Sequence, residues 1–250
     1  MKKLLIIILL SQLLFCATAE QVEQYLDVSN SEEELVEMER QFSLMQESFR
    51  SLDSNASETT APYDMELLSI RFREYLQKAL SEDEMDEVLQ NYKNVLLLQF
   101  VSAIGDPNWD EEDMKRYLKS VKENPEMKER IALVEKINKA FNNKESIAIM
   151  FDGLIKPLLK NASGGERLDD AYMKKRKEKY IKAMMEESMN ETLYATREFS
   201  MEELDALLKI AESKAMSYEV KAVYGGMAYA LEEFFLSLAN RYDISKHEKR

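Results

Sequence analysis

A short acidic stretch near the middle of the chain has the spacing of a calcium-binding loop. Asp106, Asn108 and Asp110 stand at its first, third and fifth positions, where oxygen ligands belong. The sixth position is Glu111, where the sharp turn needs glycine, and the twelfth is Tyr117, where a bidentate acid belongs. We therefore interpret the stretch as a turn that caps the next helix, and we predict no metal site.

Thioether ligands are a second possible chemistry, because the chain has 15 methionines. Met184, Met185 and Met189 fall within one predicted helix, and methionine sulfur is a ligand that copper accepts. They come without a neighbouring histidine or a tight Met-x-x-Met cluster, so we expect them to fill the core as flexible apolar side chains. The sequence predicts no cofactor.

Catalytic residue types are scarce. His247 is the single histidine and lies in a charged tail, so neither a serine–histidine triad nor a histidine zinc site is expected. No phosphate-binding glycine loop is present in the sequence. The 47 acidic residues leave an alternative, a glycan hydrolase that uses only two carboxylates, although any pair among so many acids carries little weight. We predict no catalytic residue and a protein that is not an enzyme.

The N-terminus has the composition of an export signal. Lys2 and Lys3 precede an apolar run over residues 4–15, and residues 17–19, Ala-Thr-Ala, are the small residues that signal peptidase requires. The apolar run is too short to span a membrane. We predict a signal peptide over residues 1–19, cleavage before Glu20, and a mature chain in the bacterial periplasm, with secretion as the alternative.

Cys16 leaves another alternative, a lipid anchor attached at a cleavage site directly before the cysteine. Phe15 fits this alternative poorly, because lipoproteins have a small residue at that position. Cleavage before Glu20 would remove Cys16, the only cysteine, and with it any disulfide or thiolate chemistry.

Net charge narrows the class of partner. Loss of the two leader lysines takes the formal charge from −13 to −15. Such an excess of acid repels the phosphates of nucleic acids and anionic membrane surfaces. We therefore predict a soluble mature chain with no nucleic-acid partner and no membrane insertion after cleavage of the signal.

Helix breakers are few, with 4 prolines and 6 glycines in 250 residues. The rest of the chain is rich in Glu, Lys, Leu, Ala and Met, which favour helices. No segment alternates apolar and polar residues for more than a few positions, as a half-buried strand would. The sequence predicts an all-α fold.

Two stretches of sequence agree in residue class at nearly every position, "LSEDEMDEVL" at residues 80–89 and "FSMEELDALL" at residues 199–208. Ser81 and Ser200 each precede an apolar-periodic segment and are followed three residues later by glutamate, the signature of a capping box. We interpret the pair as an internal duplication. The alternative is two unrelated helices with the same start signal.

The repeat and the breakers predict two tandem helical-bundle units behind the signal peptide. The first unit covers residues 20–124, the second covers residues 125–242, and residues 243–250 form a charged tail. Within the first unit we expect an apolar helical seam from Leu35 to Leu52 and an exposed loop over residues 51–64.

The last predicted helix follows a glycine pair. We expect Gly225 and Gly226 to break the preceding helix. After them, Met227, Leu231, Phe234 and Leu238, with Phe235 beside them, form an apolar stripe that we interpret as core, with a partner-docking face as the alternative.

The two boxes, in "LSEDEMDEVLQNY" and "FSMEELDALLKIAES", and the leucine-rich helix after each resemble a family of exported bacterial helical domains catalogued as domain of unknown function 2059. Tyr92 and Asn94 stand at the places where that family's motif continues in the first copy, and Ile210, Ala211 and Ser213 in the second. The resemblance implies an envelope location and a helical fold, and it implies no activity.

These patterns together predict a non-enzymatic helical interaction module of the periplasm. A groove or helix face would bind a protein or a peptide segment, with methionines making that face adaptable. The alternatives are an envelope enzyme that uses only acids, such as a glycan hydrolase, and a purely structural envelope component.

Overall fold

The computed structural model describes residues 16–31, 40, 66–106 and 109–239. Within these ranges every regular element is helical, which confirms the predicted all-α fold. The elements are α2 (Ala19–Ser29), α4 (Glu66–Ala79), α5 (Glu82–Asn91), α6 (Val95–Ile104), α7 (Glu111–Glu123), the 3-10 turn η1 (Pro125–Met127), α8 (Lys128–Phe141), α9 (Lys144–Met150), the π-helical η2 (Phe151–Ile155), α10 (Lys156–Asn161), the 3-10 turn η3 (Gly165–Arg167), α11 (Asp170–Ala195), α12 (Met201–Ala211) and α13 (Lys214–Ala239).

Several sequence predictions fall outside these ranges. They concern leader residues 1–15, the seam from Leu35 to Leu52 apart from Arg40, the loop over residues 51–64, and the tail with His247. In the part of the chain that is described, none of the helices combines the length and apolarity needed to cross a membrane.

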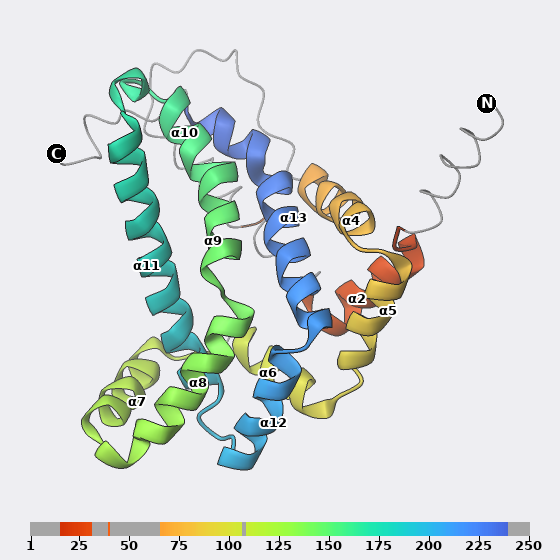
Figure 1. The fold of residues 1–250 in the computed structure, drawn as a ribbon, viewed down its shortest axis with the longest axis vertical. Coiled ribbons are helices and arrows are strands. Elements are labelled where there is room, and N and C mark those ends of the chain that lie inside the picture. The colour runs from red at the N-terminus through yellow and green to blue at the C-terminus, as the bar shows by residue number, and fades with distance from the viewer. Residues whose placement is uncertain (1–15, 32–39, 41–65, 107–108, 240–250) are drawn as a thin grey trace.

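The long helix α13 is the central element of the fold (Figure 1). It packs against α4 on one side and against α9, η2 and α10 on the other, with α11 lying beyond α9. At one end α5 contacts α13, and α2 packs against α4 and α5. At the same end, where α12 leads into the start of α13 at Lys214, α8 lies against α11 and α12, while α6 contacts α2, α11 and α12. Helices from early and late in the sequence therefore alternate in space.

One buried cluster joins the two units that the sequence predicts. It includes Leu76 of α4, Leu97 of α6, Ile137 of α8, Leu207 of α12 and Leu231 of α13. The boundary predicted after residue 124 lies between α7 and η1, and the packing of the core continues across it.

The second half of α13 belongs to this core. Leu231 and Phe234 are 3% and 0% exposed, and Met227 and Phe235 pack against the same buried cluster. Burial of these side chains confirms that the stripe is core, as interpreted from its spacing.

The prediction that Gly225 and Gly226 break a helix is wrong, because both lie inside the continuous helix α13. A Cβ atom on Gly226 would stand 2.8 Å from the ring of Phe72, and one on Gly225 would stand 2.3 Å from the Tyr75 hydroxyl. The glycines thus let α4 approach α13 more closely than any residue with a side chain would allow. Packing between the two helices outweighs the weak helix propensity of glycine.

A local change of helix type separates α9 from α10. Phe151–Ile155 forms a π-helical turn, and Pro157 follows at the start of α10. Proline has no amide hydrogen to donate and crowds the preceding turn, so a wider turn just before it accommodates the ring. The change of helix type thus lies directly before Pro157.

Both predicted capping boxes are present. The Ser81 hydroxyl accepts from the Glu84 amide at 3.2 Å while the Glu84 carboxylate accepts from the Ser81 amide at 2.9 Å, and Ser200 and Glu203 repeat the arrangement.

The correspondence between the two stretches continues into the turn that follows each short helix. Asn94 caps α6 by accepting from the Leu96 amide at 2.9 Å. Ser213 stands at the corresponding place in the second stretch and accepts from the Met216 amide at 3.3 Å, at the start of α13. Each stretch is thus a helix, a box, a short helix and a capped turn, in the same order.

The predicted cleavage site before Glu20 falls in the first turn of α2. Thr18 caps this helix and forms a capping box with Gln21. Ala17 is 1% exposed, and its amide donates to the carbonyl of Leu80 at 2.8 Å. Residues 17 and 18 therefore contribute to the packing of α2 against the start of α5.

Candidate functional site

An exposed apolar face on α6 is a feature that packing leaves unexplained; α4 has a second exposed pair, Leu67 and Ile70, which lies outside any groove described below. The helix is apolar on nearly every side, with Leu97 and Phe100 buried in the core. On the outer side Val95 is 67% exposed and Leu98 is 38% exposed. Water-exposed apolar residues that adjoin one another favour contact with a partner.

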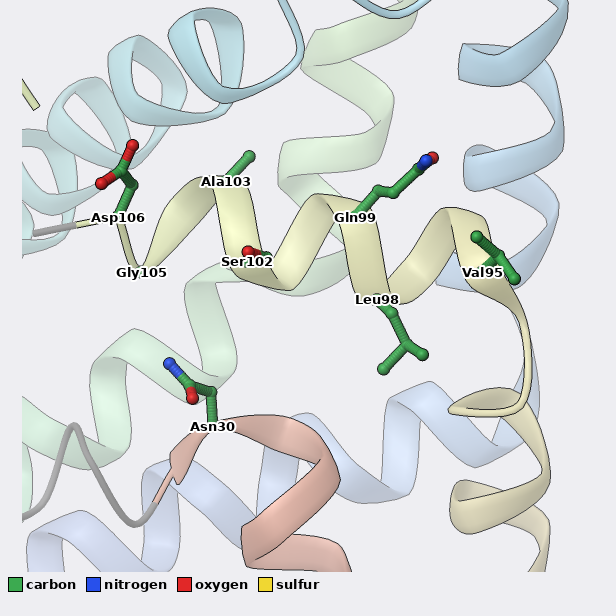
Figure 2. Close-up of a pocket in the computed structure, with 8 residues that line it drawn as sticks. All are labelled: Asn30, Val95, Leu98, Gln99, Ser102, Ala103, Gly105 and Asp106. Carbon is green, nitrogen blue, oxygen red and sulfur yellow. The ribbon is translucent and has the colours of Figure 1, made fainter. Parts of the chain in front are cut away.

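A groove of about 760 Å³ runs along this face. Figure 2 shows α6 with the end of α2 opposite it, and the side chains of Leu98 and Asn30 pointing into the space between them. The lining residues are Asn30, Val95, Leu98, Gln99, Ser102, Ala103, Gly105 and Asp106. They combine apolar groups with amides, a hydroxyl and one carboxylate.

Local backbone signals fix both walls of the groove. Asn94 caps the start of α6, and Gly105 follows its end. On the opposite wall, Asn30 ends α2 with φ of 60°, in the left-handed region that asparagine tolerates better than most residues. The groove thus lies between one helix and the terminus of another.

A buried carboxylate connects the two walls to the central helix. Tyr25 of α2 donates to Glu219 Oε1 at 2.8 Å, and Tyr92, at the end of α5, donates to the same oxygen at 2.5 Å. The two phenol rings meet edge to face with centroids 5.8 Å apart. Glu219 belongs to α13 and is 5% exposed. We call Tyr25, Glu219 and Tyr92 the tyrosine–glutamate cluster.

Few groups around the cluster can balance a negative charge on Glu219. Burial raises the pKa of the Glu219 carboxyl from 4.5 to about 7, although the hydrogen bonds from Tyr92 and Tyr25 act in the opposite direction. Its second oxygen, Oε2, is buried and has no hydrogen-bond partner among the described residues. Burial and then the charge of Glu219 raise the pKa of both phenols well above 10, so the tyrosines remain protonated donors.

The structure places the residues of the calcium-like stretch in separate roles. Asp110 caps α7, and its carboxylate accepts from the amides of Glu112 and Asp113 at 2.8 and 3.2 Å, as predicted for a capping turn. Asp106 lines the groove, and Asn108 lies outside the described residues. Within the described ranges, no three histidine, cysteine, aspartate or glutamate side chains gather as metal ligands would.

The methionines of α11 lie at the edge of the core. Met184, Met185 and Met189 are half-buried, and Met189 packs against the main buried cluster. The face that the structure leaves exposed on α6 contains no methionine. A methionine-rich binding face, as the sequence suggests, is therefore not the one that α6 presents.

Sequence reasoning missed both the groove and the cluster. A signal for Glu219 exists, because it stands four residues after Ala215 and three before Ala222, where an apolar residue is expected on the buried side of α13. A signal for the groove is the run Val95–Leu98, since four successive apolar residues cannot all face one side of a helix.

Comparison of the chain with protein-family models, with curated proteins and with solved structures finds no match. The resemblance to the exported helical family therefore stays a prediction, and function is argued from the groove.

Proposed function

We propose that the chain is an exported, non-enzymatic helical interaction module that binds a peptide segment of a partner protein in the groove along α6. The observation that carries the proposal is the exposure of Val95 and Leu98 on a helix whose other apolar residues are buried or partly buried. A peptide with apolar side chains would cover them and remove their apolar surface from water, which favours binding.

The polar lining suggests the character of the peptide. Asn30, Gln99 and Ser102 carry side-chain groups that can donate to or accept from a peptide backbone. Asp106 supplies a carboxylate at the end of the groove, and the chain as a whole has a formal charge of −13. We therefore propose a segment with two or more apolar residues followed by lysine or arginine.

The alternative of an acid-only hydrolase has less support. Such an enzyme needs two carboxylates facing one cleft at a suitable separation. Among the described residues that line the groove, Asp106 is the single acid. Glu219 has the raised pKa of a general acid, but its carboxyl is enclosed by two tyrosines and does not line the groove.

Peptide selection followed by a matched pair of substitutions tests the proposal. Peptides selected from a random library on the purified chain would be labelled and titrated by fluorescence polarisation. Leu98→Glu should weaken their binding by about tenfold or more, equivalent to about 1.4 kcal/mol, because it places a charge against apolar peptide groups.

Leu67→Glu is the control, because Leu67 is 39% exposed, as Leu98 is at 38%, but lies on α4 outside the groove. Equal loss of affinity in both variants, or no loss in either, would contradict a peptide site on α6. Fractionation of cells tests the periplasmic location separately, since a chain retained in the cytoplasm would contradict export.

A further inference from the structure

We propose that Glu219 is a proton-operated latch for the groove: protonated, it holds α2 and the end of α5 against α13, and ionised, it lets both walls of the groove loosen. The proposal rests on the proposed function only in what the groove binds. The latch itself is a property of the three side chains and of the elements to which they belong.

The cluster is placed to control both walls. Tyr92 ends α5 and stands two residues before Asn94, the cap from which α6 begins. Tyr25 lies in the last turns of α2, which ends at Asn30 on the opposite wall. Glu219 is the single side chain to which both phenols donate. A shift of either phenol would therefore move one wall of the groove relative to α13.

The latch holds less strongly when Glu219 is ionised, because the surrounding groups cannot balance the carboxylate charge. Two phenol donors satisfy Oε1, but Oε2 is buried and has no hydrogen-bond partner among the described residues. The neutral acid leaves an uncharged hydroxyl at Oε2 without a partner, whereas the carboxylate leaves a charged oxygen without a donor, which costs more. Opening of the cluster to water relieves this cost, so ionisation favours the open state.

No neighbouring charged group among the described residues offsets the cost of ionising Glu219. The described titratable groups that act on the carboxyl are Tyr25 from α2 and Tyr92 from α5. Both phenols stay neutral over the physiological range, and hydrogen bonds from Ser29 and Ser31 act on Tyr25 rather than on Glu219. Among the described residues, no lysine or arginine is a source of compensation for the charge at this site.

Hydrogen–deuterium exchange on the purified chain tests the latch without any ligand. Protection would be measured between pH 5 and pH 8 in peptides covering α2 and residues 92–98, after correction for the intrinsic exchange rate at each pH. Between the ordinary glutamate pKa and about 7, protection should fall by up to about tenfold per pH unit, and above 7 it should level off. Peptides from α7 should show no such trend.

Two variants complete the test. Glu219→Gln keeps the acceptor and the shape of the neutral acid, so protection of α2 and residues 92–98 should be independent of pH. Tyr92→Phe removes a hydrogen bond that lowers the pKa of Glu219, so the pH at which protection levels off should rise. Tyr218→Phe, a change on the same helix next to Glu219, should behave as the wild type.

A wild-type chain whose protection in α2 is constant over this range would overturn the latch, and so would a Glu219→Gln variant that loses protection as the wild type does. Neither result depends on peptide binding. Loss of peptide binding in the Leu98→Glu titration, by contrast, concerns the groove alone, so the two proposals can fail separately.

Discussion

At the scale of single residues, Glu219 is the one charged side chain that is buried among the described residues. Its carboxyl is enclosed between helices that are far apart in the sequence, since Tyr25 is 194 residues away and Tyr92 is 127 residues away. Local patterns in the sequence reveal that a charged residue occupies an apolar register, but they do not reveal its partners.

Global stability should depend on pH through this residue. The folded chain binds a proton at Glu219 up to about pH 7, whereas the unfolded chain releases it near 4.5. The stabilisation is therefore complete below about pH 4.5 and is lost as pH rises towards 7. One pKa unit corresponds to about 1.4 kcal/mol, so the loss amounts to about 3 kcal/mol.

The measurement is chemical denaturation of the wild type and of Glu219→Gln at pH 5 and pH 8. The free energy of unfolding of the variant relative to the wild type should rise between the two pH values, because glutamine cannot ionise. Glu232→Gln, at an exposed position on α13, should leave the pH dependence unchanged. A constant difference between wild type and Glu219→Gln would refute the assignment.

At the scale of elements, the contact between α4 and α13 shows how packing overrides local preference. Gly226 lies against Phe72, whose side chain is 0% exposed and so has little room to move. Helix propensity alone predicts that alanine in place of an interior glycine stabilises a helix by about 1 kcal/mol. The close contact with Phe72 predicts instead that alanine at this position destabilises the fold.

Gly226→Ala should therefore lower the free energy of unfolding, by about 1 to 3 kcal/mol, because the new methyl group overlaps the Phe72 ring. Thermal and denaturant unfolding measure the change. Ser217→Ala, at an exposed position of the same helix, controls for propensity and should be neutral or slightly stabilising. A stabilised Gly226→Ala variant would show that the helices can separate at little cost.

The difference between local and long-range contacts explains which features could be predicted from the sequence. The boxes at Ser81 and Ser200 were predictable because a capping side chain bonds to the backbone only three residues away. Gly225 and Gly226 were not, because their role depends on Phe72 and Tyr75, which meet them only after folding. The groove likewise depends on α2 and α6 coming together, and neither helix alone indicates it.

At the scale of the whole molecule, the main core includes residues from both predicted units. Leu68, Phe72 and Leu76 of α4 are fully buried, and the element that α4 contacts most extensively is α13. Each predicted unit would therefore leave an apolar face uncovered if it stood alone.

A stop codon after Tyr224 should unfold the whole chain rather than its second half. The change removes Gly226, Leu231 and Phe234, and with them much of the surface that covers α4. Circular dichroism and denaturation should show loss of cooperative unfolding, including loss of protection in α4 and α5 by hydrogen exchange. Retention of a cooperatively folded first half would show that residues 20–124 form an independent unit.

The position of α13 also constrains the order of events when the chain is made. Synthesis delivers the N-terminus first, so α4 emerges long before Lys214, where α13 begins. Contacts between residues so distant in sequence form late and slow the folding of a domain. Until α13 has emerged, the apolar face of α4 lacks the helix that covers it most extensively in the folded chain. The native packing of α4 can therefore form only after α13, the last described helix, has been made.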